Sequence, residues 1–403
     1  MTSTLLSDNS QLTAALYKKM QEIAPPVREM TSTEFGYALE NVCPPDGWDS
    51  ITVQPVNEIE LMMNDEDFYK SIPLRPKDNN KIVMDSQIKN LLQMLFVGLV
   101  SGEYSIAWVK EHFYFDVRGF YFINKTRYFT PEITAHLGGK PYAEFEKKQD
   151  GFLHLQAVGY KAFRSANAEV DQCFIETIQK LITIKGTPII IAIAGQTAAG
   201  KTEITSRLTE AFQHTGRRIS TLEIDNFLTD RDYREANGID SLGKEALHYD
   251  LLQKCMKEIR EGKRILTPRY DFVQATSSHS LSGELKPGCQ PIEIEPADII
   301  FMEGNFPFLL TEIAPLIGIK VMYLTADDVR MKRKWKRDMD YRKKYDLYYF
   351  INRYFREQFL MAEQAYKPQM VLCDLLVDTT GAAIWLTPYI QELLGEQPES
   401  SKI

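Results

Sequence analysis

The chain has little of what marks secreted, membrane-spanning and zinc-binding proteins. Its five cysteines are odd in number and scattered, and no two are spaced as CxxC, which argues against a disulfide framework and a cysteine zinc site and indicates a reducing compartment. The longest apolar run, near residues 91–100, is too short to span a bilayer. The first residues show no basic stretch followed by an apolar one, so we expect no signal peptide. These features together predict a cytoplasmic protein.

Positive charge is also scarce. The chain has 47 Lys and Arg against 55 Asp and Glu, which gives a formal net charge of -8. Because nucleic acid and anionic membranes repel an acidic surface, we expect neither as a partner. A small anionic ligand would need a local concentration of positive charge. A homo-oligomer remains open at this stage.

The chain is organised around a glycine-bounded loop that joins an apolar run to a helical pattern. Residues 189–194 form an unbroken apolar run that predicts a buried strand, and an amphipathic pattern begins at Lys201. A GxxxxGK[ST] loop in this context binds nucleotide phosphates, because its backbone N–H groups and the helix N-terminus face the anion. Lys201 can reach the outer phosphates, and the Thr202 hydroxyl can bind Mg²⁺. The predicted phosphate-binding residues are Gly195, Gln196, Thr197, Ala198, Ala199, Gly200, Lys201 and Thr202.

The pattern of apolar residues changes at Thr187. Downstream, apolar runs alternate with helical patterns, which predicts an α/β fold with a parallel sheet flanked by helices. The expected strands cover 189–194, 219–224, 299–302, 320–324 and 375–377, and the expected helices cover 201–214, 247–261, 329–342 and 346–366.

Upstream of Thr187 the patterns are mainly helical. We expect helices over 11–23 and 166–184, a further helix capped by Asp85 or Ser86, and a β-hairpin in the aromatic-rich residues 113–129. A chain of 403 residues is longer than one hydrophobic core usually serves, so we expect more than one domain. We divide the chain into an N-terminal accessory domain over 1–184, an α/β domain over 185–390 and a tail over 391–403.

Acidic residues follow two of the expected strands. Asp225 ends the strand over 219–224, where it could accept the proton of a hydroxyl that attacks the γ-phosphate, or help to hold a metal ion. Glu303 follows four apolar residues and precedes a glycine, a pattern suited to a Mg²⁺ ligand. Because ligands bind at the carboxyl ends of parallel strands, we expect both near the loop.

Two later segments carry side chains that could bind the reacting groups, one the acceptor of the phosphate and the other the phosphoryl group during transfer. Pro268 enters a segment in which Tyr270 can stack on a substrate or form a hydrogen bond with it. Residues 330–344 concentrate cations in one helix of an otherwise acidic protein. Such runs are usually solvated faces, but here they could neutralise phosphoryl oxygens.

In order and spacing, these motifs resemble those of the phosphoribulokinase and uridine kinase family of P-loop kinases. The resemblance covers 187–380 and rests on Gly195-Gln-Thr-Ala-Ala-Gly-Lys-Thr202, Ile224-Asp-Asn-Phe-Leu228, Pro268-Arg-Tyr-Asp-Phe272, Phe301-Met-Glu-Gly304, Arg337-Asp338 with Arg342, and Cys373-Asp374-Leu-Leu-Val377. The α/β domain is then expected to be a P-loop kinase domain with ATP and Mg²⁺ as cofactors. Residues 1–186 show no such resemblance.

The resemblance implies specific roles. Lys201 would bind phosphates, Thr202, Glu303 and Asp225 would surround the metal, and Asp225 would also act on the acceptor hydroxyl. Arg337 and Arg342 would close over the transferring group. The residues expected to face the acceptor are Arg269, Tyr270 and Asp271.

The acceptor is predicted to be a small metabolite with a hydroxyl group, of the nucleoside or sugar type. Two departures from the uridine kinase pattern leave other acceptors open. Residues 243–250, Gly-Lys-Glu-Ala-Leu-His-Tyr-Asp, stand where uridine kinases have an Asp-His-Pro segment. Val273-Gln-Ala-Thr276 lacks the histidine that follows Tyr-Asp-Phe in uridine kinases. Pantothenate and glycerate are alternatives, and a nucleotide-binding regulatory protein is the alternative from another class.

Overall fold

The computed structural model describes residues 9–116, 121–147, 164–239, 243–343 and 345–395, and these form two compact units. Unit 1 holds the described residues up to Arg127 together with 345–362. Unit 2 holds 128–147, 164–343 and the described residues from Glu363 onward. Each unit is therefore built from separate stretches of sequence.

The borders of these units differ from the expected boundary at residue 184. Helix α11 (Ala168–Lys185) belongs to unit 2, because its apolar residues pack in the core of the sheet described below. Helix α16 (Leu347–Met361) belongs to unit 1, because its aromatic residues lie in the core of that unit. A separate role for residues 1–184 stays a prediction.

Unit 2 is built on a seven-stranded sheet with the order β5-β15-β14-β13-β6-β12-β7. The five strands from β14 to β7 are parallel, and β15 and β5 extend one edge with antiparallel pairing. The strands are β5 (Ala143–Glu144), β6 (Ile189–Gly195), β7 (Ile219–Glu223), β12 (Ile299–Gly304), β13 (Ile319–Leu324), β14 (Leu375–Asp378) and β15 (Ala383–Leu386). The predicted parallel α/β sheet is confirmed, and the antiparallel edge is an addition to it.

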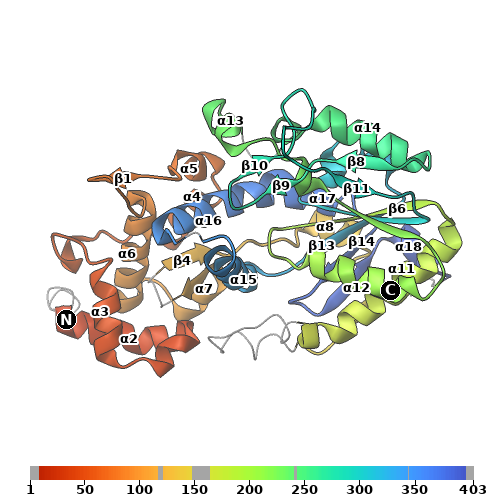
Figure 1. The fold of residues 1–403 in the computed structure, drawn as a ribbon. Coiled ribbons are helices and arrows are strands. Elements are labelled where there is room, and N and C mark those ends of the chain that lie inside the picture. Colours follow the sequence, from red (N-terminus) through yellow and green to blue (C-terminus); the bar gives the residue numbers. More distant parts are fainter. Residues whose placement is uncertain (1–8, 117–120, 148–163, 240–242, 344, 396–403) are drawn as a thin grey trace. The chain divides into compact units, whose positions relative to one another are not determined.

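The centre of the sheet is apolar on both faces. All seven residues of β6 are buried, as expected of a parallel strand with helices on both sides. Helices α11 and α12 (Lys201–Gln213) contribute Phe174, Ile178 and Leu208 to one core cluster with Ile191 and Val321 of the sheet. Figure 1 shows these two helices lying side by side.

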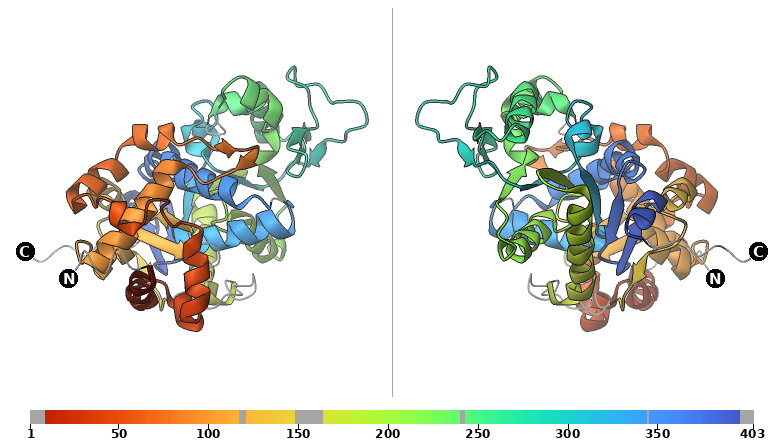
Figure 2. Two further views of the ribbon diagram at one scale, coloured as in Figure 1. Left: turned by 90° about the vertical axis from the view of Figure 1, so that its left-hand side faces the viewer. Right: turned by 90° about the vertical axis from the view of Figure 1, so that its right-hand side faces the viewer.

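The remaining elements of unit 2 follow the strand ends or join them. Two small antiparallel pairs, β8 with β11 and β9 with β10, lie outside the main sheet. The connection between β10 and β11 projects as a long loop, coloured teal in Figure 2. These elements are α8 (Pro131–His136), η3 (Ile224–Phe227), α13 (Arg231–Ala236), η4 (Lys244–Ala246), α14 (Tyr249–Arg260), β8 (Ile265–Thr267), β9 (Tyr270–Asp271), β10 (Thr276–Ser277), β11 (Ile292–Ile294), η5 (Pro307–Leu309), η6 (Ala314–Leu316), α15 (Asp327–Asp340), η7 (Ala362–Tyr366), which begins in unit 1, α17 (Lys367–Met370) and α18 (Pro388–Leu393).

Unit 1 is mainly helical, as predicted. Its only predicted hairpin is present as β3 (Phe113–Asp116) paired with β4 (Tyr121–Asn124), and its turn lies outside the described residues. Besides α16, the unit contains α2 (Asn9–Ile23), η1 (Pro25–Glu29), α3 (Ser32–Glu40), η2 (Trp48–Ser50), α4 (Val56–Met63), α5 (Glu66–Ser71), β1 (Lys77–Asp78), β2 (Lys81–Ile82), α6 (Ser86–Ser101) and α7 (Ile106–His112).

Helix α16 completes the core of unit 1. Phe355 and Phe359 pack with Tyr69 of α5, and the rings of Tyr69 and Phe359 stack with centroids 3.8 Å apart. The Asp85 side chain caps α6, as predicted, and its backbone N–H donates to Asn352 Oδ1 of α16 at 3.0 Å. Asn352 is fully buried, so this contact ties the start of α6 to α16.

Two findings bear on the absences noted in the sequence. No helix among the described residues is long and apolar enough to cross a membrane. All five cysteines, each of which lies in the described ranges, are free thiols. Burial raises the pKa of the Cys255 thiol to about 11 and that of Cys373 still further, so these two act as packing residues.

A fragment that starts at Tyr128 should expose the apolar side chains that α16 contributes to unit 1, namely Phe355, Phe359 and Leu360. Each buried side chain of this kind is worth about 1.5–3 kcal/mol. We therefore expect this fragment to bind a hydrophobic dye and to scatter light, and the same fragment with serine at those three positions to do so less. A monomeric fragment with the dye signal of the full chain would contradict this assignment of α16.

Candidate active site

The phosphate-binding loop lies between β6 and α12 and depends on its two glycines. A Cβ added to Gly195 would lie 2.3 Å from the carbonyl oxygen of Tyr323 in β13, so only glycine fits there. Gly200 has φ of 106°, in the left-handed region, and so does Ala198 at 66°. Helix α12 begins directly after Gly200, which has no side chain to cap it. Its first N–H groups can therefore bind an anion.

Lys201 folds back over this loop. Its Nζ donates to the carbonyl oxygens of Gly195 and Gln196 at 2.9 and 3.1 Å, and to Asn305 Oδ1 at 3.0 Å. Burial lowers the pKa of Lys201, and the nearby carboxylates of Asp225 and Glu303 oppose that shift. The amine is thus held at the loop by three oxygen atoms, which is the kind of environment a phosphate would also provide.

Asn305 is a site residue that our sequence analysis missed. Its Oδ1 accepts from Lys201, and its Nδ2 lies 3.5 Å from Asp225 Oδ1. The Asn305 amide therefore joins the phosphate loop to the candidate base. The available signal was its position, since it comes directly after the Glu303-Gly304 strand end.

Glu303 is the penultimate residue of β12 and lies beside the loop. Its Oε1 accepts a hydrogen bond from Thr202 Oγ1 at 2.8 Å, and its Oε2 lies 3.5 Å from Thr205 Oγ1. Burial raises the pKa of Glu303 to about 7, while Lys201 and the Thr202 hydrogen bond act in the other direction. Glu303 is thus a buried carboxyl group close to ionisation at neutral pH.

Asp225 reaches the same edge of the sheet through the neighbouring strand. Strand β7 pairs with β12 in parallel, with Glu223 opposite Glu303, and Asp225 follows in the turn η3. Burial and the charge of Asp225 both raise the pKa of Glu223. Glu223 and Asp225 therefore both lie close enough to Glu303 to affect its pKa, and Asp225 and Glu303 also act on Lys201.

The oxygen donors at this edge fit Mg²⁺. Mg²⁺ in nucleotide sites is usually bound by one or two protein oxygens together with phosphate oxygens. Thr202 and Glu303 offer such a pair, already in contact with each other. Within the described residues no cluster of three or more His, Cys, Asp and Glu side chains forms a protein-only metal site.

Helix α15 carries the basic run, and its first half holds the phosphate loop from the side. Arg330 is buried, and its Nη1 donates to the carbonyl oxygen of Thr197 at 3.0 Å. Arg333 Nη1 donates to the carbonyl oxygen of Ala199 at 3.1 Å. These two cations therefore stabilise the loop backbone instead of facing a transferring group.

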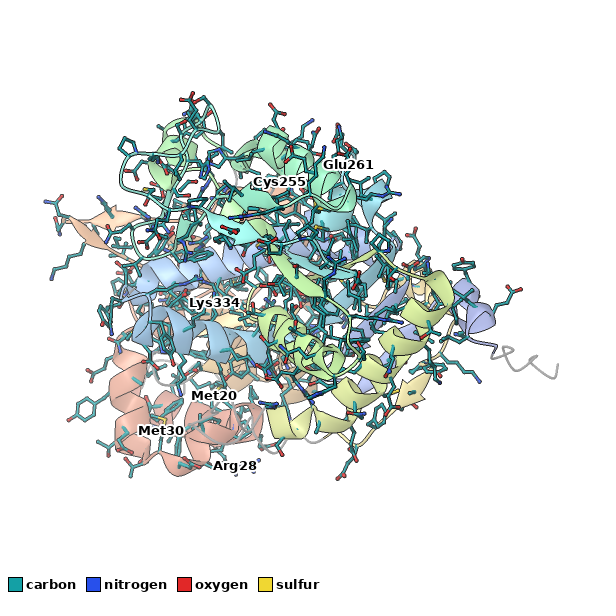
Figure 3. All side chains as sticks on the ribbon, turned by 45° about the vertical axis from the view of Figure 1, so that its right-hand side comes forward. Met20, Arg28, Met30, Cys255, Glu261 and Lys334 are labelled. Atoms are coloured by element: carbon teal, nitrogen blue, oxygen red, sulfur yellow. The ribbon has the colours of Figure 1, made fainter. Side chains whose placement is uncertain are left out.

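Arg337 lies near the end of α15 and Arg342 follows the helix, and these two residues, predicted to close over the transferring group, are called the lid arginines. Asp338 accepts from Lys334, labelled in Figure 3, at 2.7 Å and from Arg342 at 3.3 Å. Burial opposes the shift, but Lys334 and the two arginines lower the pKa of Asp338 overall. Arg337 Nε lies 3.6 Å from Asp338, and within the described residues Nε and Nη2 of Arg337 have no hydrogen-bond partner. Arg337 thus offers donors that suit an anion.

The predicted acceptor segment meets the lid through Phe272. The Arg342 guanidinium lies 4.7 Å from the centre of the Phe272 ring, which packs edge-on against Tyr270. The backbone N–H of Tyr270 donates to Asn226 Oδ1 at 3.2 Å, next to Asp225. The fold therefore brings together the lid, the acceptor segment and the Asp225 turn.

The other two acceptor candidates have structural contacts. Asp271 Oδ1 accepts from the backbone N–H groups of Val273 and Gln274 at 2.8 and 2.9 Å, which closes a turn. The backbone of Arg269 exchanges hydrogen bonds with Ser278. The role of the Arg269 and Asp271 side chains in binding the acceptor stays a prediction.

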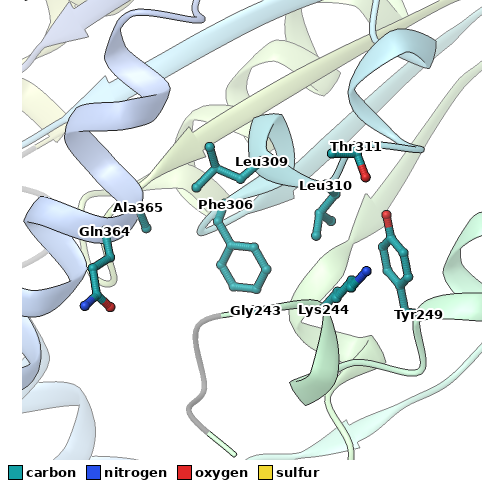
Figure 4. A pocket seen from close by; sticks show the side chains of 9 residues that line it. All are labelled: Gly243, Lys244, Tyr249, Phe306, Leu309, Leu310, Thr311, Gln364 and Ala365. Carbon is teal, nitrogen blue, oxygen red and sulfur yellow. The ribbon is translucent and has the colours of Figure 1, made fainter.

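A pocket lies near this edge of the sheet (Figure 4). It is lined by residues from three segments, namely Gly243, Lys244 and Tyr249, then Phe306, Leu309, Leu310 and Thr311, and finally Gln364 and Ala365. Phe306 directly follows Asn305, and His248 donates its backbone N–H to the carbonyl of Phe227 in the Asp225 turn. Chain neighbours of its lining residues thus reach Asn305 and the turn that carries Asp225. Arg269, Tyr270 and Asp271 are not among the residues that line it.

The pKa of Glu303 predicts a pH-dependent stability. The ordinary pKa of a glutamate is 4.5, and that of Glu303 in the folded chain is about 7. Between these two pH values Glu303 holds a proton in the folded chain but not in the unfolded chain. Stability therefore falls as the pH rises through this window, and the loss is complete above it. Glu303→Gln removes the ionisation, so in Mg²⁺-free buffer it should raise the thermal midpoint at about pH 8 and have little effect at about pH 5. The exposed Glu22→Gln is the matched control, and equal behaviour of the two variants would contradict the assignment.

About half of the chain is similar to known proteins. Residues 190–382 match the model of the Phosphoribulokinase / Uridine kinase family. A uridine kinase of Lactobacillus helveticus is 30% identical over 221 residues, which cover 52% of this chain and 97% of that protein. A uridine kinase of Brevibacillus brevis is 30% identical over 160 residues, which cover 39% of this chain and 69% of that protein. A phosphoribulokinase structure from Rhodobacter spheroides, 18% identical, covers 48% of this chain and 70% of its own with a TM-score of 0.35.

The sequence match and the arrangement of the site both indicate the same family. The relative from Lactobacillus helveticus is aligned over nearly its whole length, and the loop, Asp225 and Glu303 lie at one edge of a parallel sheet. The chain therefore belongs to the phosphoribulokinase and uridine kinase family and is an ATP-dependent kinase of small metabolites.

Proposed function

We propose that this kinase transfers the γ-phosphoryl group of ATP to a hydroxyl group of a nucleoside, such as uridine or cytidine, or of a sugar-type metabolite. The observation that carries the proposal is the chain of contacts Lys201–Asn305–Asp225, which joins a phosphate ligand to a base suited to a hydroxyl. The nucleoside is favoured because relatives at 30% identity are uridine kinases.

The donor side of the reaction uses the loop and its neighbours. The backbone N–H groups of the loop and the N-terminus of α12 bind the phosphates, and Lys201 moves from its carbonyl acceptors to phosphate oxygens. Thr202 and Glu303 would hold Mg²⁺, which when bound offsets the negative charge of the phosphates. Above about pH 7 Glu303 is ionised and able to act as such a ligand.

The acceptor side uses Asp225. Its carboxylate orients the acceptor hydroxyl and takes up its proton as the oxygen attacks the γ-phosphorus. Asn305 keeps Asp225 and Lys201 at a fixed separation by bonding to both. Asp225 would be a further ligand of Mg²⁺. No covalent intermediate is needed for direct transfer between two oxygens.

The lid arginines complete the site. Arg337 and Arg342 extend from the end of α15 and neutralise the charge of the phosphoryl group during transfer. Arg342 also contacts Phe272 of the acceptor segment, so it can respond to an occupied acceptor site. Tyr270 and Arg269 belong to the same segment and would bind the acceptor, with Asp271 shaping the turn.

The pocket in Figure 4 supports an acceptor of mixed character. Phe306 and Leu310 offer an apolar surface, and Lys244, Tyr249 and Thr311 offer polar groups. A nucleobase with its ribose, or a sugar on an apolar face, has this combination of surfaces. Pantothenate and glycerate are tested in the same panel, and ATP binding without acceptor-stimulated release of ADP would favour a regulatory protein.

Substitutions of Lys201 and Asp225 should separate binding from transfer. We expect Lys201→Ala to abolish turnover, since it removes the cation at the outer phosphates. Asp225→Asn should lower kcat by about 100- to 10,000-fold with little change in the Kd of ATP, because it removes only the base. The measurement is ADP release with uridine, cytidine, pentoses, pantothenate and glycerate. The exposed Asp46→Asn is the matched control, and full activity of Asp225→Asn would remove Asp225 from the mechanism.

A further inference from the structure

We propose that Asp171, Tyr323 and Arg333 form a buried support that fixes the backbone of the phosphate-binding loop, so that helix α11 is a working part of the nucleotide site. Helix α11 precedes the residues that match the family model. The proposal rests on the proposed role of the loop in binding ATP, and it assigns to these three side chains the positioning of that loop.

Tyr323 is the residue that touches both glycines of the loop. Its carbonyl oxygen occupies the place that a Cβ of Gly195 would need, and its ring atom Cε1 lies 3.5 Å from the place that a Cβ of Gly200 would take. The Tyr323 side chain is buried, and its ring packs against Phe174 of α11 with centroids 6.4 Å apart. A shift of this ring would therefore alter the end of the loop where α12 begins.

Asp171 holds the Tyr323 ring in place from α11. The Tyr323 hydroxyl donates to Asp171 Oδ1 at 2.8 Å, and Arg207 of α12 forms an ion pair with the other carboxylate oxygen. Asp171 is only 2% exposed. A buried carboxylate is stable only when it is paired, so Asp171, Tyr323 and Arg207 depend on one another.

Arg333 binds the loop backbone next to Tyr323, since its Nη1 and the Tyr323 ring both lie 3.5 Å from the place that a Cβ of Gly200 would take. Its Nη1 donates to the carbonyl oxygen of Ala199 at 3.1 Å and lies 3.5 Å from that of Ala198. Burial lowers the pKa of Arg333 to about 10, and the charges of Tyr323 and Asp171 oppose that shift. When the loop carbonyls are bound from outside, the N–H groups of the same peptides point to the inner side, where they can bind phosphate.

A purely electrostatic role of Asp171 predicts the opposite result from a positioning role. Loss of a negative charge beside the loop would make the site more positive and tighten the binding of phosphates. Loss of the support would let the loop carbonyls and N–H groups turn and weaken that binding. The sign of the change in affinity thus distinguishes the two roles.

The test uses the full chain with the variants Tyr323→Phe, Asp171→Asn and the double variant. Binding of ATP, and of inorganic tripolyphosphate in competition with it, is measured by calorimetry. We expect Tyr323→Phe to raise the Kd of ATP and that of tripolyphosphate by the same factor, about five- to tenfold. The factors are equal because the loop binds only the phosphate part of ATP, which tripolyphosphate shares. The double variant should weaken binding by less than the product of the two single effects, because both changes act on one hydrogen-bonded group.

The control is Tyr104→Phe, which removes a buried hydroxyl that donates to the carbonyl of Gln54 in unit 1. The inference is overturned if Tyr104→Phe weakens the binding of ATP as much as Tyr323→Phe does, or if Asp171→Asn tightens the binding of ATP. It is also overturned if no variant changes the Kd of ATP or of tripolyphosphate. Should Asp171→Asn fail to fold, Tyr323→Phe decides alone, since it keeps the ring. A wild-type chain that does not bind ATP would refute the proposed function itself, whereas normal binding by wild type and variants alike would refute only the support.

Discussion

The parallel pairing of β6 with β12 on one side and β13 on the other is the constraint on which the site depends. Parallel strands end at the same edge, so the loop after β6 and Glu303 at the end of β12 become neighbours. Strand β7, on the far side of β12, adds Asp225 at that edge. Strand β13 supplies Tyr323, whose backbone approaches Gly195 so closely that no side chain fits there.

Charge at this edge is arranged in opposed pairs. Burial lowers the pKa of Lys201 and the charges of Asp225 and Glu303 oppose that shift, while the Lys201 charge opposes the rise that burial causes in the pKa of Glu303. Burial first, and the neighbouring carboxyl groups in addition, raise the pKa of Glu303 and Glu223. The site thus accepts a less favourable electrostatic arrangement in the free chain, as is common where a charged ligand is to be bound.

The sequence predicted the parts of this fold that depend on local pattern. The central strands, the loop and the helices around it were predictable, because long apolar runs and helical periods identify buried elements. Asn305 was not, because one amide after a strand has no distinctive pattern. The membership of α16 in unit 1 was also hidden, since its aromatic residues indicate an apolar face but not the partner it packs against. The antiparallel strand β15 lies in a short apolar stretch that periodicity does not distinguish from a helix.

The placement of α16 has a consequence for the order in which the protein is made. Asp85 and Asn352 bond to each other across 267 residues of chain. Phe355, Phe359 and Leu360 enter a core whose other buried members lie before residue 123. During synthesis, unit 1 can assemble its helices early, but it cannot close its core until α16 leaves the ribosome. By then the chain through β13 has already been made. Unit 1 therefore exposes apolar surface during most of translation, the period in which a chaperone would have most effect on its yield.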